Sequence, residues 1–141
     1  MNASYILDFY ARLKNNNNRV WFDAHKAEYQ IIKTETELSV EKILQQLSVF
    51  DVSLAHTTAK ECIFRIYRDV RFSYDKTPYK THLGVFMAAC GGRKSSLAGY
   101  YLHIEPNNSA LIPGVYCPDT NVLKSLRWAI VENIDEWNEI V

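Results

Sequence analysis

Residues 62–67 read Cys62-Ile63-Phe64-Arg65-Ile66-Tyr67, and in this stretch the hydrophobic period changes from helical to extended. Cys62, Phe64 and Ile66 take alternate positions, which is typical of a strand with one buried face. Three more strands are predicted after it, at residues 84–89, 98–105 and 110–116. Their short connections favour antiparallel pairing. Pro113-Gly114 favours an edge position or a bulge for the last strand.

Helical periodicity precedes these strands. The first helix is predicted around four apolar residues that are spaced as one helical face: Ile6, Phe9, Tyr10 and Leu13. Asn2 or Ser4 is expected to cap it. A second, longer helix is predicted over residues 19–47, with Asn18 as its cap and its weakest stretch around residues 34–36.

The chain is also predicted to end in helix, from about Asp119 as the cap, with an interruption at Asn133. Together these elements predict an α+β domain. Its expected architecture is an antiparallel sheet of about four strands packed against the N-terminal helices and the C-terminal helix. With 141 residues the chain is long enough for one such domain, residues 1–141, with a sizeable core.

The composition excludes several classes of protein. Apolar residues make up 48% of the chain and charged residues 23%, which is not the composition of a disordered protein. No apolar run approaches the ~20 residues of a membrane helix, and the first residues lack the pattern of a secretory signal. The three cysteines are isolated and lack metal-site spacing: Cys62, Cys90 and Cys117. We therefore expect reduced thiols, a cytoplasmic location, no membrane contact, and no metal or cofactor.

Basic residues are concentrated in the middle of the chain. The whole sequence has 16 basic and 16 acidic residues, but residues 60–94 contain eight basic side chains and three acidic ones. A protein that binds long nucleic acid usually has more basic than acidic residues overall. The net charge of this chain is zero, so the composition does not favour nucleic acid as a partner. The distribution is compatible with a local site for a small anion, and it makes no prediction of oligomeric state.

Three motifs in this chain resemble those of one known family. They are F-R-I-Y-R-D-V-R-F-S at residues 64–73 with D-K-T-P-Y-K at 75–80, N-N-N-R-V-W-F-D-A-H-K at 16–26, and G-R-K at 92–94 with G-Y-Y-L-H-I-E-P at 99–106. Over nearly its whole length the chain is similar to the uncharacterised family catalogued as domain of unknown function 2461. The resemblance implies no agreed biochemical activity. Because members of that family normally continue beyond this point, it also implies a single domain that lacks the family's usual C-terminal portion.

The central motif supplies a candidate anion site. Its five cations are Arg65, Arg68, Arg71, Lys76 and Lys80. A straight strand would place Arg65 and Arg68 on opposite faces. A turn near Asp69 would gather four of the five at one end of the sheet, namely Arg68, Arg71, Lys76 and Lys80. Arginine binds phosphate or carboxylate with a planar fork and lysine adds a point charge, so the pattern predicts a small ligand with one of these groups. The alternative is a non-catalytic module, in which acids such as Asp69 and Asp75 tie the cations into a structural network or the segment contacts an acidic partner.

Candidates for acid–base chemistry lie nearby in the sequence. His82 and His103 are the titratable side chains best suited to proton transfer near neutral pH. His103 is the preferred catalytic candidate, with Asp75 as a second; Tyr101, which shares a strand face with His103, joins the candidate ligand contacts. A structural histidine is the competing interpretation. The sequence thus predicts a domain that binds a small anion and leaves open whether it also catalyses a reaction.

Overall fold

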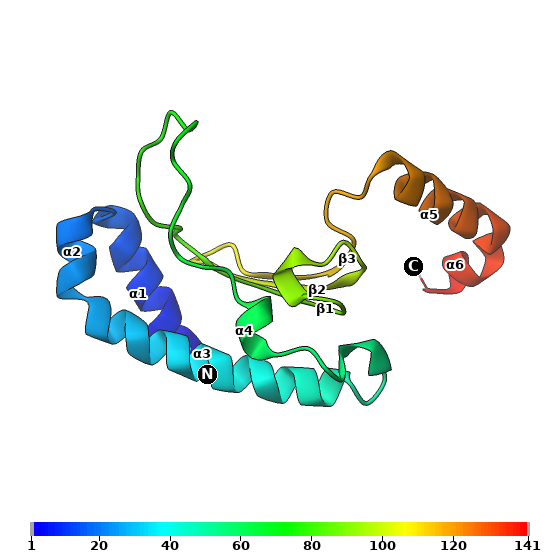
Figure 1. The fold of residues 1–141 in the computed structure, drawn as a ribbon, viewed down its shortest axis with the longest axis horizontal. Coiled ribbons are helices and arrows are strands. Elements are labelled where there is room, and N and C mark those ends of the chain that lie inside the picture. Colours follow the sequence, from blue (N-terminus) through cyan, green and yellow to red (C-terminus); the bar gives the residue numbers. More distant parts are fainter. Residues whose placement is uncertain (1, 141) are drawn as a thin grey trace.

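The computed structural model describes residues 2–140 and places a layer of helices against one face of a small sheet, with a helical arm to one side (Figure 1). The helices are α1 (Ala3–Asn15), α2 (Arg19–Ala24), α3 (Lys26–Leu47), α4 (Ala59–Cys62), α5 (Thr120–Glu132) and α6 (Ile134–Ile140). The strands are β1 (Leu83–Ala88), β2 (Gly99–Ile104) and β3 (Ala110–Gly114), and two 3₁₀ turns lie at Val52–Leu54 and Gly92–Lys94. The predicted α+β class is confirmed.

The N-terminal helices begin where the amide side chains predict. The Asn2 side chain accepts a hydrogen bond from the Tyr5 amide at the start of α1, and the Asn18 side chain accepts one from the Trp21 amide in α2. The predicted apolar face of α1 is fully buried. The long predicted helix, however, is divided at His25, whose ring Nδ1 lies 2.8 Å from the Trp21 carbonyl oxygen. Residues 34–36 are not a weak point, because Thr36 is buried and its hydroxyl donates to the Ile32 carbonyl.

The sheet has three antiparallel strands in the order β1-β2-β3, not four, so β3 is an edge strand as predicted. Residues 62–67 do not form the predicted first strand. A capping box between Thr58 and Glu61 holds a helical turn through Cys62. The chain after Cys62 is extended, but its backbone hydrogen bonds go to two different segments. The Phe64 amide donates to the Gly84 carbonyl of β1, whereas the Ile66 carbonyl accepts from the Lys80 amide. Only isolated bridges result.

The two faces of the sheet differ in what covers them. One face places Leu83, Val85, Met87 and Ile104 in the hydrophobic core with the buried side chains of α1 and α3. The residues that alternate with these along the strands belong to the opposite face of the sheet, which we call the open face. The strand register places these residues together on it: Gly84, Phe86, Tyr101, His103 and Ile112. No helix of residues 2–140 covers the open face in Figure 1.

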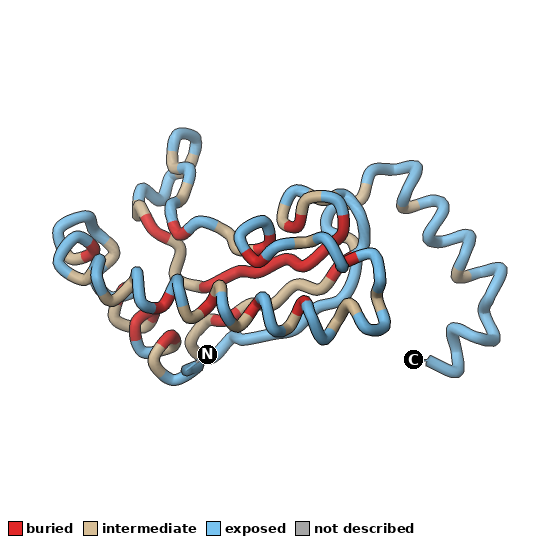
Figure 2. Tube along the Cα trace, turned by 60° about the horizontal axis from the view of Figure 1, so that its bottom comes forward, coloured by how far each residue is buried: buried red, intermediate tan, exposed pale blue. Residues whose placement is uncertain are grey.

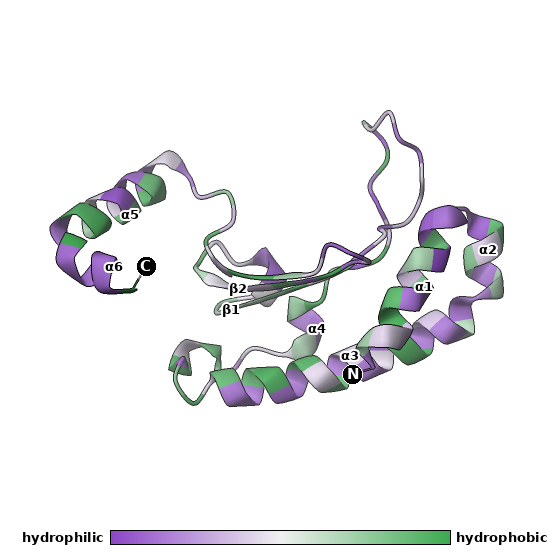
Figure 3. Ribbon diagram, turned by 180° about the vertical axis from the view of Figure 1, so that it is seen from behind, coloured by the Kyte–Doolittle hydropathy of each residue, from purple (hydrophilic) through white to green (hydrophobic). Residues whose placement is uncertain are grey.

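The C-terminal helices form an arm that stands away from the sheet. Asp119 caps α5 and Asn133 separates α5 from α6, as predicted. The expectation that this helix packs against the sheet is wrong, because neither α5 nor α6 has a buried residue (Figure 2). Apolar side chains such as Trp128 and Val131 are more than 60% exposed. Hydrophobic segments, coloured green, recur along the arm in Figure 3. Among the described residues, no helix is long and apolar enough to cross a membrane.

Candidate functional site

A pocket of about 420 Å³ lies on the open face of the sheet. Its floor is formed by Phe86 of β1, Tyr101 of β2 and Ile112 of β3, which are neighbours in the strand register. The flanking chain adds its other lining residues: Phe64, Lys80, His82, Arg93, Ser95, Pro113, Gly114, Val115 and Tyr116. Among these described lining residues none is acidic, and four are Phe or Tyr. The pocket therefore combines apolar surface with two cations, Lys80 and Arg93.

Lys80 is one of the two cations that line the pocket, and it is partly buried. The segment after Pro78 is held by the bond from the Lys80 amide to the Ile66 carbonyl, 2.8 Å. The ammonium nitrogen lies 5.0 Å from the centroid of the Phe64 ring, a cation–π contact. It forms no ion pair with any of residues 2–140. Burial lowers the pKa of Lys80 below its usual value, and the nearby charge of Arg65 lowers this pKa further.

Arg93 is the second cation of the pocket, and the backbone fixes its position. It lies on the 3₁₀ turn Gly92–Lys94, and its Nη1 donates to the carbonyl oxygens of Lys60 and Glu61 at 2.6 and 2.9 Å. The turn packs so closely on α4 that a Cβ at Gly92 would lie 2.6 Å from the Glu61 carbonyl carbon. These bonds use one guanidinium nitrogen, so the planar fork has other donors left for a ligand.

Three polar side chains form a hydrogen-bonded chain along β2. The Tyr101 hydroxyl lies 3.1 Å from His103 Nδ1, and His103 Nε2 lies 3.1 Å from Glu105 Oε2. A carboxylate can only accept, so in the neutral ring Nε2 donates to Glu105 and Nδ1 accepts from Tyr101. Bonds from Asn108 and His103 lower the pKa of Glu105, which keeps it ionised. This arrangement can pass a proton between the pocket and the far end of the strand.

His82 lies beside this chain. Its ring centroid is 4.4 Å from that of His103. Burial lowers the pKa of His82, and the neighbouring His103 and Lys80 lower it further, although Glu105 acts in the opposite direction. The ring is therefore neutral at pH 7 and offers one donor and one acceptor nitrogen.

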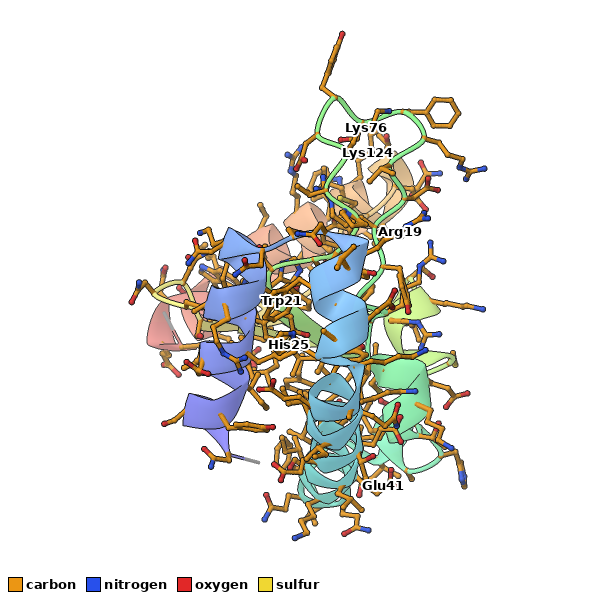
Figure 4. All side chains as sticks on the ribbon, turned by 90° about the vertical axis from the view of Figure 1, so that its left-hand side faces the viewer. Arg19, Trp21, His25, Glu41, Lys76 and Lys124 are labelled. Atoms are coloured by element: carbon orange, nitrogen blue, oxygen red, sulfur yellow. The ribbon has the colours of Figure 1, made fainter. Side chains whose placement is uncertain are left out.

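The structure places three of the predicted cations away from this pocket. Residues 68–77 form a protruding loop, with Lys76 near its far end in Figure 4. Arg68 pairs with Asp75, also donating to Thr77, and Arg71 pairs with Asp69. Lys76 donates to the Val70 carbonyl at 3.0 Å.

Asp75, the second catalytic candidate, stabilises this loop. Its carboxylate accepts from the Thr77 amide and from Arg68, and these bonds lower the pKa of Asp75 to about 2. The Arg71 guanidinium likewise lowers the pKa of Asp69 to about 2. Asp75 is not among the residues that line the pocket.

Arg65 lies in an adjoining groove of about 540 Å³, between α3 and residues 60–67. The groove shares Phe64 and Arg93 with the pocket, and its other basic residues are Lys26, Lys33 and Lys60. Glu37 is the one acid among its described lining residues, and it lies 3.9 Å from Lys33. Of the predicted ligand contacts, the structure therefore brings Lys80 and Tyr101 into the pocket, places Arg65 beside it, and keeps Arg68, Arg71 and Lys76 in the loop.

A further aromatic cluster lies on the other side of the molecule. Trp21 of α2 and His25, which follows α2, are both labelled in Figure 4; their rings stack at 3.9 Å, and Trp21 also contacts Phe9 of α1. These contacts join α1 to α2, which is a structural role.

Sequence reasoning missed two polar members of the site. Glu105 follows Tyr101 and His103 at two-residue spacing in G-Y-Y-L-H-I-E-P, so strand alternation could have placed all three on one face. Arg93 gave no such signal, because its place in the lining of the pocket depends on how the turn Gly92–Lys94 packs against α4.

Comparison with known proteins identifies a family but no characterised relative. The family model described as "Conserved hypothetical protein (DUF2461)" matches residues 5–141. No curated protein and no solved structure matches the chain. The match covers nearly the whole chain and confirms the predicted family. The chain belongs to the DUF2461 family.

Proposed function

We propose that this protein binds a small anionic ligand, with an aromatic or apolar part, in the pocket on the open face of the sheet. The observation that supports it most is the charge of the lining. Lys80 and Arg93 line the pocket, and no acid accompanies them among the described lining residues. Lys80 is half-buried and forms no ion pair with residues 2–140, which is unfavourable unless a ligand or solvent compensates its charge.

The shape and chemistry of the pocket suit one class of ligand. A volume near 420 Å³ accommodates a molecule of one or two rings. Rings of Phe64, Phe86 and Tyr116 offer apolar contact, whereas Lys80 and Arg93 offer charge-assisted hydrogen bonds to phosphate or carboxylate. Two such bonds contribute ~3–6 kcal/mol in total. Apolar contacts add to this and the cost of association offsets part of it, so we expect a dissociation constant of roughly millimolar order.

Phenyl phosphate is a suitable probe, because it has one ring and one phosphate. Titration calorimetry should detect binding at roughly millimolar affinity or better. Lys80→Met, which keeps the stem and removes the charge, should weaken that binding about tenfold or more. Lys76→Met is the matched control, since Lys76 is in the loop, and it should leave the affinity unchanged. Equal loss in both variants, or no binding to the unmodified protein, would contradict the proposal.

A structural network remains the second candidate for the loop. The pairs Arg68–Asp75 and Arg71–Asp69 favour it, because each guanidinium already has a carboxylate. On this account Arg68→Ala loosens residues 68–77 and leaves the affinity for phenyl phosphate unchanged. Loss of phenyl phosphate binding in Arg68→Ala would instead return the anion site to the loop.

A further inference from the structure

Lys80 differs from an ordinary anion-binding lysine in its surroundings. It is half-buried in a pocket with apolar walls, makes no ion pair with the described residues, and lies close enough to Arg65 for the two charges to repel. An acid beside a lysine holds the amine in its protonated form, and no acid of residues 2–140 forms an ion pair with Lys80. Apolar enclosure and a second cation are the two surroundings that favour the neutral, nucleophilic amine.

We propose that Lys80 acts as a nucleophile and forms an imine with an anionic ligand that has an aldehyde or ketone group. This inference rests on the proposed function, because it assumes that the same pocket holds the anionic group. For a ligand with a carbonyl group, Arg93 holds the phosphate or carboxylate without Lys80, and the aromatic floor holds the carbon skeleton. The carbonyl carbon then lies against the Lys80 amine. For a ligand that lacks a carbonyl group, such as phenyl phosphate, Lys80 is protonated and shares the anion with Arg93.

The reaction balances without an oxidant or reductant. The lone pair of neutral Lys80 Nζ attacks the carbonyl carbon, and the carbonyl oxygen takes up a proton to give a carbinolamine. The carbon–oxygen bond then breaks, both amine protons leave with the oxygen as water, and a carbon–nitrogen double bond forms. Tyr101, which lines the same pocket, is linked through His103 to Glu105, and this chain provides a route for the proton exchange.

Two related probes separate binding of the anionic group from formation of the imine. Pyridoxal 5′-phosphate has an aromatic ring, a phosphate and an aldehyde, whereas pyridoxine 5′-phosphate has an alcohol in place of the aldehyde and cannot form an imine. Borohydride reduces an imine to a stable secondary amine, and peptide mass spectrometry then identifies the modified lysine. Lys76 in the loop and Lys124 in α5 serve as internal controls, because both are exposed on the same chain.

At neutral pH and limiting aldehyde, Lys80 should be modified about tenfold faster than Lys76 or Lys124. Lys80→Arg, which retains the charge, should remove the fast reaction while Lys76 and Lys124 still react slowly. Pyridoxine 5′-phosphate should bind the unmodified protein and slow the labelling of Lys80.

The failures are distinguishable. If the alcohol binds but Lys80 reacts no faster than the control lysines, the nucleophilic role is wrong and the binding function stands. If Lys80 reacts fast but the alcohol neither binds nor protects it, the amine is reactive and the anion site is wrong. If neither probe distinguishes Lys80, both proposals are wrong.

Discussion

At the scale of single residues, the nearest partner of each cation decides what that cation can do. Arg68 pairs with Asp75 and Arg71 pairs with Asp69, so both guanidinium groups already have a carboxylate partner within the loop. Lys80 and Arg93 lie far apart in the sequence, yet both line one pocket that lacks an acid among its described residues. The sequence shows how many basic and acidic residues lie in residues 60–94, but the fold decides which cation lies beside which acid.

The histidine tautomer is the first prediction at this scale. Because ionised Glu105 accepts from His103 Nε2, the neutral His103 ring should have its proton on Nε2. Nitrogen NMR at a pH where the ring is neutral identifies the protonated nitrogen directly. Glu105→Ala should lose this fixed tautomer and give a mixture. A proton found on Nδ1 in the unmodified protein would contradict the hydrogen-bonded chain.

The second prediction concerns stability in acid. The pKa values of Asp69 and Asp75 fall from 3.8 to about 2 in the folded protein. A lowered pKa means that the carboxylate stabilises the fold above the unfolded-state value, and that this contribution is lost as pH falls through the folded value. The free energy of unfolding should therefore decrease between about pH 4 and pH 2.

Asp75→Asn tests that loss, since it keeps the shape and an acceptor oxygen but removes the charge. Denaturant unfolding at pH 5, 4, 3 and 2 should show a shallower decline for the variant than for the unmodified chain. Parallel declines would mean that Asp75 is not held ionised by Thr77 and Arg68.

At the scale of the elements, local patterns predicted most boundaries, and packing decided the rest. The apolar face of α1 and the Asn2, Asn18 and Asp119 caps depend on neighbours in sequence, so they were predictable. Residues 62–67 have the alternation of a strand but lack a continuous partner, because β1 bonds only to their first part. Alternation of apolar residues predicts that a segment is extended, but it does not predict which other segment will pair with it.

The same limit applies to the candidate site. Tyr101 and His103 were predictable as partners because they lie two residues apart in one strand. The contribution of Arg93 was not, because it requires the turn Gly92–Lys94 to meet the backbone of α4, and no local pattern encodes that contact.

The tight contact of this turn gives a prediction at the element scale. Gly92 has φ +56°, and an added Cβ would lie 2.6 Å from backbone atoms of Glu61. Gly91, with φ +112°, has the strain of a positive φ but meets nothing closer than 4.0 Å. Gly91→Ala should therefore cost about 1 kcal/mol, and Gly92→Ala should cost about 2 kcal/mol or more because the backbone must also move.

Urea unfolding measures both costs, and binding of phenyl phosphate provides a second measurement. Because Arg93 follows Gly92 directly, Gly92→Ala should also weaken that binding, whereas Gly91→Ala should not. Equal stability of the two variants would show that the contact between the turn and α4 is loose.

At the scale of the whole molecule, the stable part of the chain is the helical layer and the sheet. Its core contains residues from α1 to β2, whereas the arm formed by α5 and α6 contributes none. Burial of apolar surface is the main source of folding free energy. Deleting residues 119–141 should therefore change Tm by less than about 3 °C.

Thermal unfolding followed by circular dichroism tests that expectation. The shortened chain should lose helical signal in proportion to the arm and still unfold in one cooperative step. A Tm lowered by about 8 °C or more would mean that the arm packs on the rest of the chain in solution.

The central claim is that an anion binds between Lys80 and Arg93. A crystal structure of the protein with phenyl phosphate tests it most directly, because the electron density locates the phosphate. We predict the phosphate within hydrogen-bond distance of both side chains, with the ring over Phe86 and Tyr101. Phosphate found among Arg68, Arg71 and Lys76 in the loop, with the pocket holding only solvent, would contradict the account.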